Sequence, residues 1–209
     1  LLSCPRVLIF YLKLIFFPDP SSYSIAHDFD ISTSFFSPWT TMPAWIIVVV
    51  IIIFSAKRAK LSPLISFSIL FYFLNHFIES TIIPLELIFE HRNYIPSYFL
   101  FVPVALGINY LFTYYEDRKI MYLFLITACT SLIFFFGSST YIRNTAWLSE
   151  KSLWEDAYNK NTSRAEPFLK LAEYYKKNRK YDKALSLYHK SLQHKGQRVQ
   201  KSRVLAYNN

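Results

Sequence analysis

Four apolar stretches without any Asp, Glu, Lys or Arg dominate this sequence, and their lengths suit a lipid bilayer. They cover residues 40–56, 61–78, 97–115 and 120–141, and a fifth apolar stretch covers residues 1–18. A helix needs about 20 mainly apolar residues to cross the ~30 Å hydrocarbon core. The chain is 53% hydrophobic with only 3 Gly in 209 residues, which is not the composition of a soluble domain. We therefore predict an all-α chain in which residues 1–142 form a polytopic bundle of transmembrane helices.

The charged residues divide the chain into two parts. Residues 1–142 contain 8 Lys and Arg against 8 Asp and Glu, whereas residues 143–209 contain 15 against 6 and supply the whole net charge of +9. A neutral apolar part and a basic polar part require two environments. We predict a connecting helix over 143–166 and a separate domain over 167–209.

The orientation follows from the basic loops. Lys57, Arg58 and Lys60 form the densest positive loop between apolar stretches, and the positive-inside rule places that loop in the cytoplasm. Alternation then makes residues 19–43 and 79–96 external and residues 116–119 cytoplasmic. Everything after Tyr141 is expected on the external side, in a periplasm or an ER lumen.

Residues 168–196 fit one tetratricopeptide repeat, a helical hairpin of 34-residue period. The positions that such a hairpin buries are taken by Phe168, Leu171, Ala172, Tyr175, Ala184 and Tyr188. Leu205-Ala206 repeats Leu171-Ala172 after 34 residues, which indicates a truncated array. An unrelated amphipathic hairpin is the alternative. The repeats predict a protein partner or acceptor, and the Lys-rich segment 176–183 has too few aromatic residues for nucleic-acid binding.

The first external loop carries an acidic pair. Asp28 and Asp30 are two positions apart, so an extended chain places both side chains on one side. There they could hold a divalent metal ion or serve as acid and base. An ordinary polar loop is the alternative. Glu79 is a third acidic candidate, at the end of an apolar stretch. The sequence contains no nucleophile elbow, P-loop, HExxH or CxxC, so no further metal or nucleotide site is predicted.

The second external loop contains more ionisable residues. Pro84 suits the first turn of a helix, and Glu86 and Glu90 would then share a face. Ionisable groups at a membrane boundary are costly, which makes them functional candidates. Arg92 could bind a phosphate through two hydrogen bonds, with the side chains of Glu90, His91, Asn93 and Tyr94 around it. An interfacial helix anchored by Tyr and Arg is the alternative.

Three segments precede the repeat in this order: YLKLIFFP…HDFDIS, IIPLELIFEHRNYIPS and YIRNTAWLSEKSLWEDA. In this order they resemble the transmembrane and tetratricopeptide repeat-containing protein family, whose members look like O-mannosyltransferases of the GT-C glycosyltransferase class. The family's ER..Y.PS block is matched by Glu90, Tyr94, Pro96 and Ser97. His91 holds the family's Arg position, and Arg92 is displaced by one residue.

The resemblance implies the C-terminal half of a GT-C-like membrane domain followed by a repeat hairpin. Such enzymes transfer a sugar from a polyprenyl-phosphate carrier to an external protein or glycan, and Arg92 and Arg143 would neutralise the phosphate. The family's catalytic carboxylate lies in an earlier external loop, so we expect this chain to be a fragment whose catalytic residue is unknown.

Two other functions remain open. An O-antigen-ligase-like enzyme would transfer a whole glycan and use external Arg and His residues against a lipid diphosphate. A non-enzymatic, membrane-anchored repeat scaffold would recruit protein partners, and its residues 79–97 would tolerate replacement.

The orientation can be tested by labelling cysteines from outside the cell. Because three predicted spans separate the Lys57–Lys60 loop from Trp154, we expect a cysteine at position 154 to react and a cysteine at position 58 to stay protected. Labelling at position 58 without labelling at position 154 would reverse the predicted topology.

Overall fold

The computed structural model describes residues 2–27, 29–82, 88–160 and 164–193, except for the side chains of residues 78–82 and 193. These residues form eight α-helices and two 3-10 helices, without a β-strand among them, which confirms the all-α prediction. The contacts group the chain into two units. Unit 1 comprises Leu1–Pro18 and Asp30–Gly137, and unit 2 comprises Asp19–Phe29 and Ser138–Asn209.

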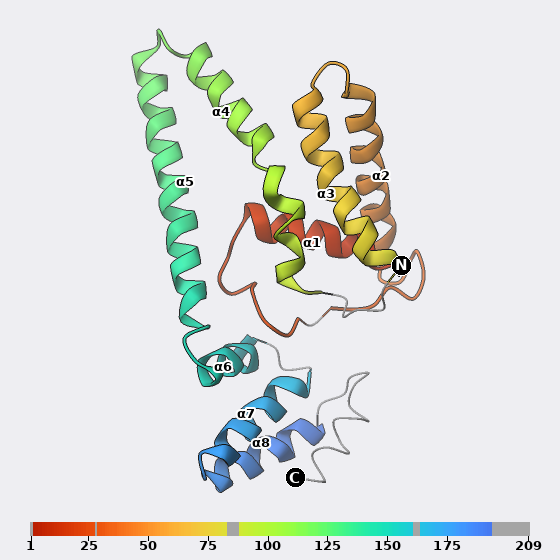
Figure 1. Ribbon diagram of the computed structural model, residues 1–209, viewed down its shortest axis with the longest axis vertical. Coiled ribbons are helices and arrows are strands. Elements are labelled where there is room, and N and C mark those ends of the chain that lie inside the picture. Colours follow the sequence, from red (N-terminus) through yellow and green to blue (C-terminus); the bar gives the residue numbers. More distant parts are fainter. Residues whose placement is uncertain (1, 28, 83–87, 161–163, 194–209) are drawn as a thin grey trace. The chain divides into compact units, whose positions relative to one another are not determined.

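Unit 1 is built around a hairpin of two apolar helices, α2 and α3 (Figure 1). Val48 of α2 packs with Tyr72 and Phe73 of α3 and with Leu100 in one buried cluster. In Figure 1, α1 runs crosswise to both helices. The elements are α1 (Cys4–Phe16), α2 (Thr41–Arg58), α3 (Pro63–Ile82), η1 (Glu90–Asn93), η2 (Pro96–Phe99), α4 (Val102–Tyr114) and α5 (Lys119–Thr145), whose residues from Ser138 on belong to unit 2.

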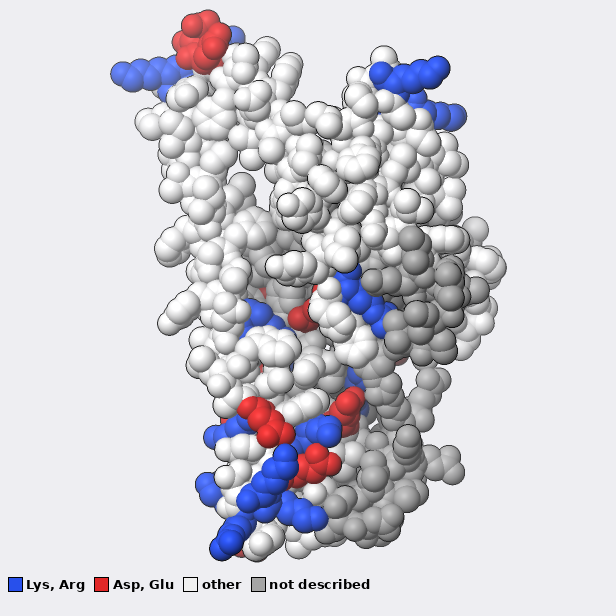
Figure 2. Space-filling model, viewed as in Figure 1, with Lys and Arg blue, Asp and Glu red and all other residues white. Residues whose placement is uncertain are grey.

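Three helical segments are long and apolar enough to cross a membrane: Thr41–Arg58, Pro96–Tyr114 and Lys119–Thr145. They coincide with the predicted spans 40–56, 97–115 and 120–141. None of the residues of α4 is buried, and Ser139 is the only buried residue of α5. Figure 2 shows a broad surface of these two helices without Lys, Arg, Asp or Glu. An apolar surface of this extent requires a lipid or protein environment rather than water.

The other two predicted spans, residues 1–18 and 61–78, correspond to α1 and α3. At 13 residues, α1 measures about 20 Å, less than the ~30 Å core, and the predicted span over residues 1–18 stays a prediction. The helix ends because Pro18 disfavours helical geometry at Phe17, whose φ is -129°. In α3, the apolar part that matches the predicted span 61–78 covers Pro63–Phe77.

Unit 2 contains the helical hairpin that the repeat pattern predicts, formed by α7 (Glu166–Lys177) and α8 (Tyr181–Gln193). The turn between them places Arg179 in the left-handed region, with φ 57°. The hairpin core contains Phe168, Leu171, Ala172, Ala184, Leu187 and Tyr188, with Tyr175 packed against it. The end of the predicted repeat at residues 194–196 and the matching Leu205-Ala206 pair lie outside the described residues.

A third helix, α6 (Glu150–Lys160), packs on this hairpin through Trp154 and Tyr158. The ring of Tyr158 meets that of Phe168 edge-on, with centroids 4.9 Å apart. The Tyr175 hydroxyl donates to Glu155 Oε1 at 3.2 Å, and burial raises the pKa of Tyr175, which keeps it a neutral donor. The predicted connecting helix over 143–166 is therefore two pieces: the end of α5 and a helix that belongs to the hairpin core.

Replacing Ala184 tests the packing of α7 against α8. Ala184 is 3% exposed, so Ala184→Arg places an unpaired cation in the contact, and we expect the free energy of opening the hairpin to fall by at least about 2 kcal/mol. The measurement is hydrogen exchange of the α7 and α8 amides in the full chain. Leu185→Arg is the matched control, because Leu185 is 59% exposed and should tolerate the charge. Equal protection in both variants would contradict the packing.

Candidate functional site

The 3-10 turn η1 carries the candidate phosphate-binding residues and is tied to α1 by one side chain. The Tyr11 hydroxyl accepts a hydrogen bond from Phe89 N at 2.7 Å and donates one to Phe89 O at 3.1 Å. Tyr11 is 2% exposed. The residue that precedes η1 is therefore fixed through its own backbone, which leaves the side chains of the turn available for other contacts.

Buried polar groups lie beneath this turn. His76 of α3 is packed between the rings of Tyr11, at 5.4 Å between centroids, and Tyr72, at 4.7 Å. Asn93, the last residue of η1, is buried, and it is a polar neighbour of His76 together with Arg92. Tyr72 is fully buried and donates a hydrogen bond to Leu8 O at 3.2 Å. The end of α3, the middle of α1 and η1 thus form one packed polar cluster at the edge of the apolar bundle.

Arg92 is the cation of this cluster. Its guanidinium lies 5.2 Å from the centroid of the Phe89 ring, and the His91 ring lies 5.0 Å from the same ring. Arg92 and Glu90 are partly exposed, and Tyr94 is 84% exposed. Stacking on an aromatic ring holds the guanidinium plane while leaving its N–H groups able to bind an anion. The chemistry that η1 offers is recognition of a phosphate or carboxylate.

Arg143 lies in unit 2 and is held by an ion pair. Its Nη1 donates to Asp156 Oδ2 at 2.8 Å, and its guanidinium lies 5.7 Å from the Trp147 ring and 6.0 Å from the Tyr23 ring. Lys160 Nζ lies 2.6 Å from the other Asp156 oxygen. The Arg143 and Asp156 side chains are 11% and 20% exposed. Arg143 therefore contributes to the packing of α6, and its phosphate contact, which the resemblance implies, stays a prediction.

The acidic candidates do not form a described site. Asp28 and Glu86 lie outside the described residues, and so does the Glu79 side chain. Asp30 is exposed, and its backbone oxygen accepts a hydrogen bond from Arg6 Nη1 at 2.7 Å. Among the described residues, no group of three or more His, Cys, Asp or Glu side chains gathers where a metal ion could bind.

Sequence reasoning missed the residues that position both candidate arginines. Tyr11, Tyr72 and His76 support η1, and only the i, i+4 spacing of Tyr72 and His76 hinted that they share a helix face. The contact between α6 and residues 19–27 was also missed. Lys160 Nζ donates to Pro20 O at 2.7 Å and to Tyr23 O at 3.0 Å, and more than a hundred residues separate these partners in the sequence.

We compared the chain with protein-family profiles, with curated proteins and with solved structures, and none of them matches it. The geometry of the described residues therefore carries the functional argument.

Replacing Asp156 tests the ion pairs of unit 2. Asp156→Asn leaves two partly buried cations without their countercharge. We expect the free energy of opening α6 to fall by about 2 kcal/mol, a value between the contributions of exposed and of buried ion pairs. Hydrogen exchange of α6 and of residues 19–27 in the full chain measures this. The matched control is Glu173→Gln, because the Lys170–Glu173 pair is 43% and 42% exposed and should change stability by less than about 1 kcal/mol. Equal effects would show that the Asp156 pairs add no stability.

Proposed function

We propose that this protein is a membrane glycosyltransferase that moves a sugar from a polyprenyl-phosphate carrier to an external protein or glycan acceptor. The observation that carries the proposal is the Arg92 guanidinium, stacked on Phe89 in a turn that Tyr11 fixes at the end of an apolar helix. A lipid-linked sugar presents its phosphate at such a boundary. A fixed guanidinium is the side chain best suited to bind that phosphate through two hydrogen bonds.

The reaction needs two contributions from the protein. The acceptor hydroxyl forms a bond to the anomeric carbon while the bond from that carbon to the phosphate oxygen breaks, and a carboxylate takes the hydroxyl proton. Negative charge grows on the departing polyprenyl phosphate, so a cation held in place before the reaction stabilises the transition state. We assign this second contribution to Arg92. The carboxylate is not assigned to any residue.

The proposal includes a sidedness and a GT-C-like fold. In it, η1 is on the external side, opposite the turn that contains Lys57 and Arg58, and the α7–α8 hairpin is a tetratricopeptide repeat on that same side. The packed hairpin core also supports the scaffold function, because a repeat face can hold a protein partner without catalysis. The two functions differ in what they require of Arg92.

Arg92→Lys separates them. It keeps the positive charge and loses the two-pronged contact, so we expect sugar transfer by the full-length protein to fall about a hundredfold. The measurement is transfer from a radiolabelled polyprenyl-phosphate sugar. Arg58→Lys is the matched control, because its guanidinium also stacks on a Phe ring, 5.3 Å from the Phe54 centroid, far along the chain from η1. Near-normal transfer by Arg92→Lys would reject the assignment, and the absence of transfer by the unaltered protein would favour the scaffold.

A further inference from the structure

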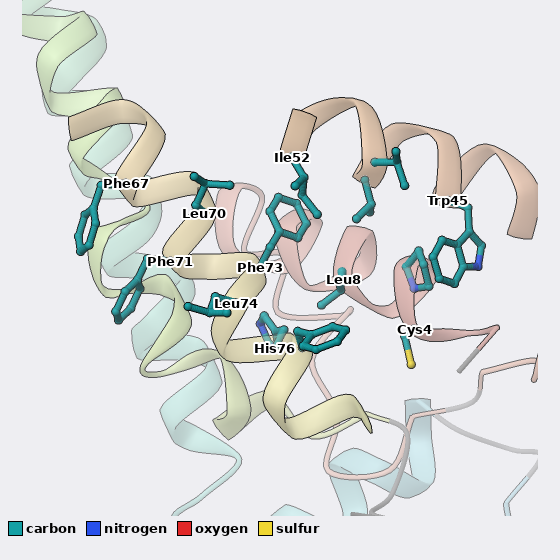
Figure 3. Close-up of a pocket in the computed structure, with 14 residues that line it drawn as sticks. Cys4, Leu8, Trp45, Ile52, Phe67, Leu70, Phe71, Phe73, Leu74 and His76 are labelled. Carbon is teal, nitrogen blue, oxygen red and sulfur yellow. The ribbon is translucent and has the colours of Figure 1, made fainter. Parts of the chain in front are cut away.

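Unit 1 contains an apolar groove of about 700 Å³ that the proposed function leaves unused. Figure 3 shows that its walls come from α1, α2 and α3. This volume lies within the ~300–1,000 Å³ of sites that bind small molecules. Representative lining residues are Cys4 and Leu8 from α1, Trp45 and Val49 from α2, and Phe73 and His76 from α3.

His76 is the polar residue of this groove. Its side chain is 2% exposed, and its Nε2 atom has no hydrogen-bond partner among the described residues. The neighbouring tyrosines do not serve it, because the hydroxyl of Tyr11 bonds to Phe89 and that of Tyr72 to Leu8. Asn93 is its remaining polar neighbour, and Asn93 Oδ1 is likewise buried without a hydrogen bond among the described residues. A buried polar atom without a partner costs free energy. The groove therefore combines apolar walls with one polar atom that needs a partner.

The position of the groove indicates where its occupant comes from. Val49, Leu74 and Phe77 line it and are 42%, 60% and 65% exposed, so it opens on the apolar outer surface of the hairpin. Thr41–Arg58, which forms one wall, is a candidate membrane span. The molecules that meet such a surface are lipids. His76 lies near the η1 end of α3, with Arg92 as a cationic neighbour, which favours a lipid whose polar end carries phosphate.

We propose that the groove binds one acyl chain of a membrane glycerophospholipid, and that His76 Nε2 donates a hydrogen bond to an ester or phosphate oxygen of that lipid. This assignment uses the neutral tautomer with its proton on Nε2. The size of the groove suits a single acyl chain better than the much longer tail of a polyprenyl carrier. The inference goes beyond the proposed function and stands without any sugar transfer.

Photolabelling of the full chain tests the proposal. The protein is reconstituted in phosphatidylcholine vesicles with a small fraction of phosphatidylglycerol that carries a diazirine in one acyl chain. We expect adducts at Leu8 and Leu74 at least about fivefold above those at Leu132, which is 51% exposed on α5 outside the groove. Labelling of the same intensity at all three positions would show ordinary lipid contact and overturn the proposal.

Two variant pairs test the site itself. Val49→Trp should block the groove and remove most labelling of Leu8, whereas Val50→Trp should not, because the adjacent Val50 is 57% exposed and does not line the groove. His76→Phe keeps an aromatic ring and removes Nε2. We expect about fivefold weaker labelling of Leu8, because one net hydrogen bond changes the affinity for the lipid by about that factor. His189→Phe, at an exposed position of α8, is its control.

The remaining outcomes also decide the question. Unchanged labelling in both Val49→Trp and His76→Phe, each with an unaltered melting temperature, would reject the site. If either variant fails to fold, the other and the distribution of adducts in the unaltered protein decide. Competition by unlabelled polyprenyl phosphate at equal concentration should leave the labelling unchanged. Displacement of the photolabelled lipid would assign the groove to the sugar carrier instead. A loss of sugar transfer in Arg92→Lys without a change in labelling would leave the phospholipid site intact.

Discussion

The structure of unit 1 depends on one constraint: inside a bilayer, the backbone must satisfy its own hydrogen bonds. Residues 46–53 of α2 are all Ile or Val, which favour strands in water, and yet they are helical. A lone strand would leave a row of donors and acceptors in hydrocarbon, whereas a helix leaves none in its interior. The exposed apolar side chains of α4 and α5 agree with such an environment, because they are stable against hydrocarbon and costly in water.

Polar side chains within these helices obey the same constraint. Thr127, Thr130 and Ser131 of α5 each donate to a carbonyl one turn earlier, and Ser68 of α3 donates to Leu64 O at 2.8 Å. A hydroxyl that bonds to its own helix can face lipid at little cost. Tyr11 and Tyr72 differ, because their hydroxyls bond to the backbone of other segments and so join α1 to η1 and α3 to α1.

Composition alone predicted the apolar helices, because the absence of charge over 17 or more residues is decisive in a bilayer. The ends of the helices were less predictable. Pro18 stops α1 early, and Glu90, which was expected on an α-helix that began at Pro84, lies instead in a 3-10 turn. Contacts between distant segments could not be predicted, since nothing local to Lys160 indicates that it will bond to Pro20 and Tyr23. The hairpin core was predictable at the positions that the repeat pattern marks as buried. Trp154 also packs against this core, but it precedes the repeat in the sequence, so the pattern could not indicate it.

Arg92 and Arg143 are both candidate phosphate ligands by sequence, and their surroundings differ. The type of a residue therefore does not by itself determine its role. Arg143 meets a carboxylate at 2.8 Å in a partly buried setting, so an incoming phosphate would have to compete with Asp156 for the same guanidinium. Arg92 is stacked on an uncharged ring, and this contact does not occupy its N–H groups. A cation that recognises a transient phosphate must be positioned without being neutralised. By that criterion Arg92 fits the proposed phosphate contact better than Arg143, which holds α6 through Asp156.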